Sequence, residues 1–360
     1  MSTTRMIDDL AALVEAESPS GSPTATRLAA DRLDELLEAH TGRRAEWVGD
    51  ERGHLLWSGG GRTRVLLLGH VDTVWPVGTR ARWPFDVANG RATGPGCFDM
   101  KAGLVQGLAA LSRLDDLTGV ALLATTDEEI GSPTSRELVE RTAAGCDAVL
   151  VLEPSAAGAL KTARKGVALY EVVVTGRAAH AGLEPEAGAN AAVEAAHQVL
   201  DIAALGDRSA GTTVTPTVLA AGTTTNTVPA SARVAVDVRA VDAAEHARVD
   251  AALRALPAHV DGCTVEVVGG VNRPPLEAAS SAALFARAQR LAAELGQPPL
   301  EGASVGGASD GNFTAGVGVP TLDGLGAVGG GAHAEGEHVV VDAMAPRSAL
   351  VGALLRELLA

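Results

Sequence analysis

Aromatic side chains are scarce in this chain of 360 residues, at 2% of the sequence. The hydrophobic core must therefore be built from Ala, Val and Leu, and the rows of surface aromatics that stack on single-stranded nucleic acid are excluded. Basic residues are also few. The 29 Lys and Arg residues face 44 Asp and Glu residues, which gives a formal net charge of −15. Because such a surface repels polyanions, we expect no nucleic-acid partner.

Cysteines and long apolar segments are equally sparse. Cys97, Cys146 and Cys263 are odd in number and far apart, which argues against a disulfide framework and against a thiolate metal site. No apolar stretch reaches the ~20 residues that span a bilayer, so we expect no membrane association. Residues 1–18 lack the basic start, apolar run and cleavage site of an export signal. These features predict a soluble protein of the reducing cytoplasm.

The length of the chain exceeds the usual size of one domain, so we expect two hydrophobic cores. The first part of the chain has short, continuous apolar runs, which are typical of strands buried on both faces. These runs are Val65–Leu68, Val120–Leu123 and Ala148–Leu152. Helical spacing of Leu and Ala occurs around and between them, over Ile7–Glu17, Thr24–His40, Lys101–Leu114 and Ser135–Ala144. The pattern predicts an α/β catalytic domain with a mixed, largely parallel sheet.

A different pattern begins near Gly166 and alternates strand, helix, strand, strand, helix, strand. The expected elements are Val167–Thr175, Ala189–Leu205, Val214–Ala220, Ala232–Arg239, Ala243–Leu256 and Thr264–Val268. This order predicts a smaller α+β insert of the ferredoxin-like βαββαβ type. A helix over 279–295 and a buried strand over 319–322 then resume the first domain. We therefore expect a catalytic domain over 1–165 and 273–360, interrupted by an insert over 166–272.

Polar side chains follow the apolar runs at the points where each run ends. The runs pass into side chains that can bind metals: His70 and Asp72, then Glu128 and Glu129, then Glu153. In open α/β sheets, sites form beyond the carboxyl ends of the strands. A lone histidine after a strand is also a common structural residue, but a carboxylate two positions later can hold its imidazole in one tautomer. Adjacent glutamates can equally be a solvated pair, or can divide metal binding from proton transfer.

Two further candidates lie in glycine-rich loops. Asp99 follows Gly94-Pro95-Gly96 at the start of a predicted helix, where an aspartate can also be a simple N-cap. His333 lies in a loop late in the chain, where most histidines are merely exposed. With His70, Glu129 and Glu153, these residues make two histidines and three carboxylates, the nitrogen and oxygen ligands that catalytic Zn²⁺ accepts. Two ions would need to share a carboxylate.

At these motifs the chain resembles the two-zinc aminoacylase, acetylornithine deacetylase and glutamate carboxypeptidase family, and the similarity is greatest to bacterial glutamate carboxypeptidases. The resemblance extends over nearly the whole chain. The motifs that carry it are His70–Val74, Gly94–Gly96 with Asp99–Gly103, Asp127–Ser132, Glu153-Pro154, Gly176–Gly182, Ala221–Asn226, Asp237–Arg239 and the His333 loop. Each motif is weak alone, whereas their shared order is specific.

The resemblance implies two zinc ions in each subunit, with Co²⁺ or Mn²⁺ as possible substitutes, and a cis peptide between Asp99 and Met100. The implied roles are a bridging carboxylate for Asp99, one metal held also by His70 and Glu153, and the other held also by Glu129 and His333. It further implies that Asp72 orients His70 and that Glu128 is the general base. The implied reaction is hydrolysis of an amide bond to an amino acid in a small acyl-amino acid or short peptide.

The resemblance also assigns roles to the insert, which would act as a lid and dimerisation module of a homodimer. His180 and Asn226 would reach the active site of the neighbouring subunit, where His180 helps to stabilise the oxyanion. Arg239 would bind the substrate carboxylate, with Lys161 as a second candidate for substrate binding.

The sequence departs from the carboxypeptidase pattern in two places. Arg164 and Lys165 stand where smaller or uncharged residues are expected, which suggests a different or more acidic substrate. Met100 follows the bridging acid, as it often does in deacetylases and desuccinylases. Two alternatives therefore stay open: an N-acyl-amino-acid deacylase of the acetylornithine deacetylase or succinyl-diaminopimelate desuccinylase type, and an inactive dimeric binding protein.

Overall fold

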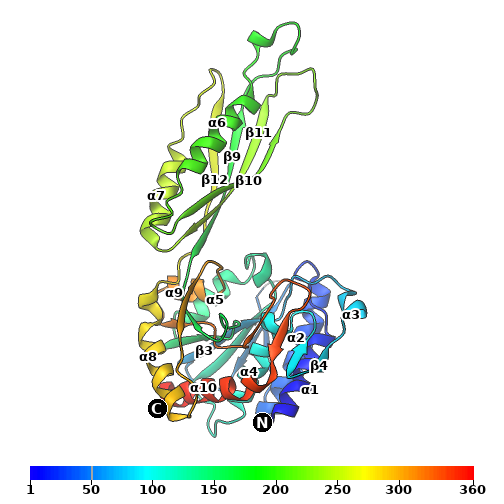
Figure 1. Ribbon diagram of the computed structural model, residues 1–360, viewed down its shortest axis with the longest axis vertical. Coiled ribbons are helices and arrows are strands. Elements are labelled where there is room, and N and C mark those ends of the chain that lie inside the picture. Colours follow the sequence, from blue (N-terminus) through cyan, green and yellow to red (C-terminus); the bar gives the residue numbers. More distant parts are fainter. Residues whose placement is uncertain (50–51) are drawn as a thin grey trace. The chain divides into compact units, whose positions relative to one another are not determined.

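The computed structural model describes residues 1–49 and 52–360, which form two compact units (Figure 1). Unit 1 comprises Met1–Arg164 and Leu276–Ala360, and unit 2 comprises Lys165–Pro275. Unit 2 thus begins at residue 165 rather than the expected 166 and ends at 275 rather than 272. None of the described helices is both long and apolar enough to cross a membrane.

The main sheet of unit 1 has six strands in the order β1-β2-β6-β3-β7-β14. These strands are β1 (Glu46–Val48), β2 (His54–Ser58), β3 (Val65–His70), β6 (Val120–Thr125), β7 (Ala148–Val151) and β14 (Thr321–Leu322). β3 pairs in parallel with β6 and β7, and β14 pairs in parallel with β7. β2 is antiparallel to both β1 and β6. The predicted mixed, largely parallel sheet is confirmed, with the three apolar runs at its centre.

Helices cover both faces of this sheet, which explains why its central strands are apolar throughout. The helices of unit 1 are α1 (Thr3–Glu15), α2 (Pro23–Thr41), α3 (Thr79–Arg82), α4 (Ala102–Leu111), α5 (Arg136–Ala143), α8 (Ala278–Glu294), α9 (Gly311–Gly316) and α10 (Val341–Leu359). Successive strand side chains point to opposite faces. Leu67 accordingly joins a core with α1, α2, α4, α8 and α10, whereas Leu66 and Leu68 join a second core with α5 and α9.

Local signals set the ends of α2. The hydroxyl of Ser22 accepts a hydrogen bond from the backbone N–H of Ala25, and Pro23 occupies the first turn. The helix ends at Gly42, whose φ of 72° is a left-handed conformation that glycine adopts without steric cost. These signals match the predicted helix over residues 24–40 closely.

Two small sheets that the sequence pattern does not predict complete unit 1. One has the order β15-β16-β5-β4, and the other pairs β13 with β8. Their strands are β4 (Asp86–Ala88), β5 (Arg91–Thr93), β8 (Leu160–Arg164), β13 (Gly302–Val305), β15 (Gly329–Gly330) and β16 (His338–Val340). Strands this short carry no readable periodicity. The antiparallel pairing of β16 with β5 nevertheless places His338 opposite Thr93, and so brings the His333 loop to the loop that carries Asp99.

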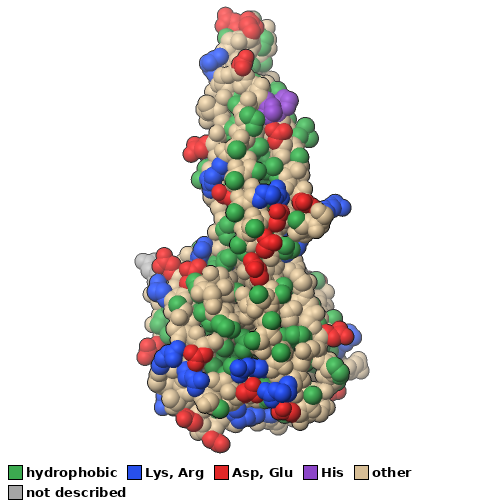
Figure 2. All heavy atoms as spheres, turned by 90° about the vertical axis from the view of Figure 1, so that its left-hand side faces the viewer, with side chains coloured by type: hydrophobic (Ala, Val, Ile, Leu, Met, Phe, Trp, Pro, Cys, Tyr) green, Lys and Arg blue, Asp and Glu red, His purple; other side chains and the backbone are tan. Residues whose placement is uncertain are grey.

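Unit 2 has the predicted βαββαβ order and a four-stranded antiparallel sheet, β10-β11-β9-β12. Its elements are β9 (Gly166–Thr175), α6 (Ala191–Ala204), β10 (Thr213–Ala221), β11 (Ser231–Ala240), α7 (Ala243–Arg254) and β12 (Thr264–Arg273). Alternate residues of β9 and β11, including Val172 and Val234, pack with both helices in a core of small aliphatic side chains. On the face in Figure 2, Lys and Arg side chains lie among Asp and Glu side chains in each unit.

Helix α4 packs closely against the segment that follows β7, and this contact can be tested by substitution. A Cβ atom added to Gly103 would lie 1.9 Å from the carbonyl oxygen of Leu152. Although alanine is the better helix former, we predict that Gly103→Ala lowers the free energy of unfolding by about 1–3 kcal/mol, because the backbones must separate. Denaturant unfolding measures this change.

Gly145→Ala is the matched control, since a Cβ there meets nothing within 4 Å. Its free energy of unfolding should stay within about 0.5 kcal/mol of the parent value. Equal stability of the two variants would contradict the packing of α4 described here.

Candidate metal centre

The central strands of unit 1 bring three candidate ligand segments to one edge of the sheet. His70 is the last residue of β3, the tandem Glu128 and Glu129 lie in the single turn after β6, and Glu153 follows β7. These strands are neighbours in the order β6-β3-β7 and run parallel. Their carboxyl ends therefore meet at one place, as the sequence predicts.

Loops bring the remaining two candidates to the same place. Asp99 lies in the turn Cys97–Lys101 that precedes α4, and the peptide bond from Asp99 to Met100 is cis, as the family resemblance predicts. His333 lies between β15 and β16 with a φ of 60°, which is unusual for a residue other than glycine.

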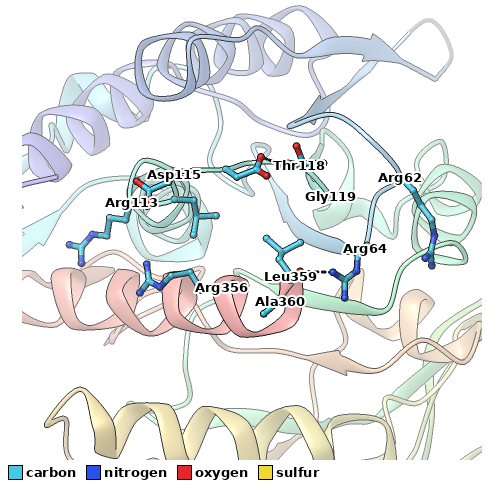
Figure 3. Close-up of a pocket in the computed structure, with 11 residues that line it drawn as sticks. Arg62, Arg64, Arg113, Asp115, Thr118, Gly119, Arg356, Leu359 and Ala360 are labelled. Carbon is cyan, nitrogen blue, oxygen red and sulfur yellow. Dashed lines mark hydrogen bonds between the residues drawn. The ribbon is translucent and has the colours of Figure 1, made fainter.

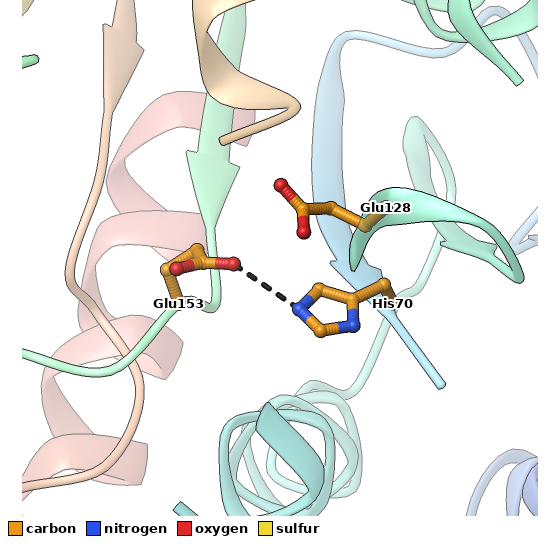
Figure 4. Close-up of side chains that lie close together, drawn as sticks. All are labelled: His70, Glu128 and Glu153. Atoms are coloured by element: carbon orange, nitrogen blue, oxygen red, sulfur yellow. Dashed lines mark ion pairs between the residues drawn. The ribbon is translucent and has the colours of Figure 1, made fainter. Parts of the chain in front are cut away.

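Asp99 stands between the two histidines and faces each with a different carboxylate oxygen. His70 Nε2 lies 3.5 Å from Asp99 Oδ1, and His333 Nε2 lies 3.4 Å from Asp99 Oδ2. On the first side, His70 Nε2 is also 3.3 Å from Glu153 Oε1, an ion pair drawn in Figure 4. On the second side, His333 Nε2 is 3.1 Å from Glu129 Oε2. This is the arrangement that a shared carboxylate requires.

Two buried polar atoms of this cluster lack the hydrogen bonds that such atoms normally make. His70 Nε2 and Glu129 Oε1 are buried and have no hydrogen-bond partner among the described residues. The ligand atoms of His70, Asp99 and Glu129 all lie within 4.8 Å of one another, as do those of His70, Glu128 and Glu153. A cation on each side would satisfy these atoms, and the nitrogen and oxygen donors suit Zn²⁺. The residues present therefore fit a metal.

The charges of the cluster shift the protonation of its members strongly. Burial opposes the charging of His70, but the carboxylates around it raise its pKa well above the ordinary value. Close contacts with Asp99 and Glu129 raise the pKa of His333 to about 10. Burial and the charge of Asp99 disfavour ionisation of Glu153, yet Arg164 and the other cations around it lower its pKa to about 2. The carboxylates thus favour protonation of both histidines, and a metal that binds their nitrogens must displace those protons.

Asp72, for which the family resemblance implies an orienting role toward His70, contacts both this histidine and the turn of the tandem glutamates. The Nδ1 atom of His70 lies 2.9 Å from the backbone oxygen of Asp72 and 3.5 Å from its carboxylate. That carboxylate accepts hydrogen bonds from the backbone N–H groups of Glu128 and Glu129, at 3.2 and 3.1 Å, and from the hydroxyl of Ser20 at 2.6 Å. Asp72 thus fixes the turn that carries the tandem glutamates. Ser20 has no sequence signal that marks it.

The tandem glutamates point to different sides of the cluster, as their adjacency suggests. Glu129 belongs to the group with His70 and Asp99, whereas Glu128 belongs to the group with His70 and Glu153. Figure 4 shows the Glu128 carboxylate lying over His70 and Glu153. Only 8% of Glu128 is exposed, so the alternative of a solvated acidic pair is wrong.

Arg164 was interpreted as a sign of a more acidic substrate, and the structure does not support that interpretation. Its guanidinium is buried and binds Asp323 through Nε at 2.8 Å and Nη2 at 3.1 Å. Nη2 also donates to Glu153 Oε2 at 2.9 Å, and Nη1 donates to the carbonyl of Gly307. Arg164 is thus already occupied by protein carboxylates. Sequence alone cannot show such a pairing, because Asp323 lies 159 residues further along the chain.

Lys161 lies at the same side of the cluster. Its Nζ is 3.6 Å from Glu153 Oε2, and 12% of its side chain is exposed. Glu153 Oε2 therefore faces two cations, while Glu153 Oε1 is left toward His70. The position of Lys161 beside the cluster is compatible with the predicted role in substrate binding.

The other predicted site residues belong to unit 2. His180 and Asn226 are exposed and lie on paired segments, since Ala181 donates its N–H to the carbonyl of Asn226 at 2.9 Å. Gly182 donates its N–H to His180 Nδ1 at 3.1 Å. Arg239, on β11, forms a two-point ion pair with Asp237 at 2.8 and 2.9 Å.

A separate cavity of about 580 Å³ in unit 1 contains none of these groups (Figure 3). Arg62, Arg64, Arg113 and Arg356 line it. Two of these cations are already paired, because Arg62 and Arg64 both bind Asp147 at 2.9 Å. The chemistry of unit 1 is therefore concentrated at the carboxyl edge of the main sheet.

Known proteins share both this sequence and this fold. A model of peptidase family M20/M25/M40 matches residues 66–357. Carboxypeptidase G2 of Pseudomonas sp. (strain RS-16) is 33% identical over 314 residues, which cover 83% of this chain and 75% of the relative. Succinyl-diaminopimelate desuccinylase of Azoarcus sp. (strain BH72) is 28% identical over 338 residues, covering 84% and 86%.

The fold comparison agrees with the sequence comparison. The crystal structure of a tripeptidase from Staphylococcus aureus subsp. aureus Mu50 superimposes with a TM-score of 0.80 at 21% identity, over 99% of both chains. The family match and the ligand-type residues at the sheet edge indicate an enzyme rather than an inactive binding protein. The chain belongs to peptidase family M20/M25/M40 and is a metal-dependent hydrolase.

Proposed function

We propose that this chain is a two-zinc hydrolase that cleaves the amide bond to an amino acid, with glutamate carboxypeptidase-like specificity. The observation that carries the proposal is the position of Asp99, whose two oxygens face His70 and His333 separately, next to the unsatisfied atoms of His70 and Glu129. Such a cluster suits two cations that share one carboxylate. Co²⁺ and Mn²⁺ accept similar ligands and are expected substitutes.

Each metal would then have its own protein ligands besides Asp99. His70 and Glu153 would hold one ion, and Glu129 and His333 would hold the other. Bound zinc lowers the pKa of a water toward ~7 and polarises the carbonyl to be attacked.

Glu128 is the general base in this proposal. Its carboxylate lies in the group with His70 and Glu153 but is not needed to complete either set of ligands. It accepts a proton from the attacking water and donates that proton to the leaving nitrogen. The hydrogen bonds from Glu128 and Glu129 N–H to Asp72 keep the base and the neighbouring ligand at fixed positions during the transfer.

Substrate binding is assigned to Arg239, Asn226 and Lys161. The planar guanidinium of Arg239 suits a carboxylate because it can donate to both oxygens, as it does to Asp237. A substrate carboxylate would have to compete with that aspartate. His180 is proposed to stabilise the oxyanion.

A deacylase remains the second candidate. Met100 after the bridging acid favours it, as does the similarity to a succinyl-diaminopimelate desuccinylase. A panel of N-acetyl, N-succinyl and folyl- or peptidyl-glutamate substrates, given to the zinc-loaded protein, separates the candidates. We expect the highest kcat/KM for a glutamate amide. A strong preference for N-succinyl or N-acetyl substrates would favour the deacylase, and no hydrolysis of any amide would refute both.

The tandem glutamates provide a direct test of the assigned roles. Glu128→Ala should reduce kcat by at least about 100-fold, because proton transfer is lost, while zinc content stays near that of the parent. Glu129→Ala should lose zinc as well as activity. Metal analysis together with steady-state kinetics distinguishes the two variants, and the reverse pattern of zinc loss would require the roles to be exchanged.

We also propose a cytoplasmic homodimer in which unit 2 is the dimerisation module. The edge strand β10 supports an assembly role, since its Val218 and Leu219 are 62% and 52% exposed. Leu200, on α6, is 70% exposed. The three cysteines are free thiols, which is compatible with a reducing compartment.

If His180 acts on the neighbouring subunit, two inactive variants should complement each other. Mixing Glu128→Ala with His180→Ala protein forms heterodimers in which one site has both residues intact. Those heterodimers should recover activity toward half that of the parent dimer. Tagged subunits verify the exchange, and verified heterodimers without activity would show that His180 does not act across a dimer.

A further inference from the structure

Glu337 is a buried acid at the end of an otherwise exposed loop. Residues 331–336 are all exposed, including His333, whereas Glu337 has no exposed surface. Glu335, two positions earlier, is 65% exposed in its side chain and pairs with Arg82. An acidic residue in a polar loop is ordinarily solvated, so the burial of Glu337 requires a reason.

The carboxylate of Glu337 accepts four hydrogen bonds, three of them from the loop that carries Asp99. Its Oε1 accepts the backbone N–H groups of Phe98 at 2.8 Å and Asp99 at 2.9 Å. Its Oε2 accepts the N–H of Gly96 at 3.1 Å and the indole Nε1–H of Trp75 at 2.9 Å. Four neutral N–H groups thus converge on two oxygens.

A carboxylate is the side chain that matches this set of donors. An ionised glutamate only accepts hydrogen bonds and has room for about four of them. A glutamine here would replace one carboxylate oxygen with an NH₂ group. That group would face two N–H donors instead of accepting from them, so those buried donors would lose their hydrogen-bond partner. The site therefore selects glutamate rather than a polar residue of that size.

These hydrogen bonds connect the segments that hold two proposed ligands of one metal. The N–H of Asp99 itself binds Glu337, and Glu337 lies four residues after His333 on the loop that leads into β16. The side chains of Asp99 and His333 lie 3.4 Å apart. The pairing of β16 with β5 holds the two segments together at their other ends.

We propose that Glu337 is a positioning residue that sets Asp99 against His333 and thereby determines the affinity of the metal centre. This inference rests on the proposed two-metal site. Groups that orient metal ligands typically change metal affinity by 10–100-fold when they are altered. Because Asp99 is the proposed ligand of both ions, loss of Glu337 should weaken both sites.

The test compares Glu337→Gln with the matched control Glu335→Gln, which removes the same charge from the same loop. Metal-free proteins are titrated with Zn²⁺ in the presence of a competing chelator, and Co²⁺-loaded proteins are examined by absorption spectroscopy. Glu337→Gln should bind Zn²⁺ about 10–100-fold more weakly and should shift the Co²⁺ bands. Glu335→Gln should match the parent in both measurements.

Trp75→Phe is a milder variant that keeps the test possible if Glu337→Gln does not fold. It removes one hydrogen-bond donor to Glu337 and leaves the carboxylate in place. Its Zn²⁺ affinity should fall about fivefold, as expected for one hydrogen bond. Circular dichroism of the metal-free variants checks their fold.

Two results would overturn the inference. The first is a folded Glu337→Gln protein with parental Zn²⁺ affinity and an unchanged Co²⁺ spectrum. If Glu337→Gln does not fold, the second is a Trp75→Phe protein that binds Zn²⁺ with parental affinity. Failure of the parent itself to bind two Zn²⁺ would instead refute the proposed function on which the inference rests.

Discussion

Repulsion among carboxylates that are crowded at one edge of a sheet is the constraint on which this structure depends. Asp99, Glu128, Glu129 and Glu153 converge there, and all but Asp99 are at least nine-tenths shielded in their side chains or as whole residues. Like charges at such distances repel strongly where water is excluded. The arrangement is stable only if cations lie among them, and the two histidines, Lys161 and Arg164 supply part of that charge. Metal ions in the proposed site would take the place of the histidine protons, and the buried atoms of His70 and Glu129 that lack hydrogen bonds mark where they would bind.

The residues around the cluster hold the carboxylate ligands in position but do not neutralise all of their negative charge. Asp72 fixes the turn of the tandem glutamates through backbone hydrogen bonds, and Arg164 binds one oxygen of Glu153 while the other faces His70. Asp323 in turn holds Arg164 by two contacts. Glu153 is thus restrained at the oxygen that faces away from His70, and the tandem glutamates are restrained through their backbone. Such restraint reduces the rearrangement needed when a metal binds, which favours affinity and a defined geometry.

Sequence predicted the parts of the site that continue from regular structure. His70, Glu129 and Glu153 follow apolar runs, and parallel pairing of those runs makes their meeting a geometric necessity. Asp99 and His333 lie in glycine-rich loops, where no periodic pattern predicts their position. Only the family resemblance placed them in the site. Periodicity also recovered the two-unit organisation and the order of elements in unit 2, since those strands and helices are long. The two- and three-residue strands that bring the His333 loop to Asp99 carry no pattern of this kind.

Contacts between side chains that are far apart in the sequence could not be predicted from the sequence. Arg164 looked like a substrate-facing cation because its partner Asp323 comes from a distant segment. No sequence feature marks Glu337 as buried, because its burial follows from backbone N–H groups that every residue type except proline carries. Arg164 and Glu337 are both charged side chains that hold other residues in place.

Anomalous diffraction at the zinc edge from crystals of the zinc-loaded protein tests the central claim most directly, namely that Asp99 is shared by two metals. We expect two peaks ~3.5–4 Å apart, with one carboxylate oxygen of Asp99 bonded to each. A single peak, or two peaks of which Asp99 contacts only one, would contradict it.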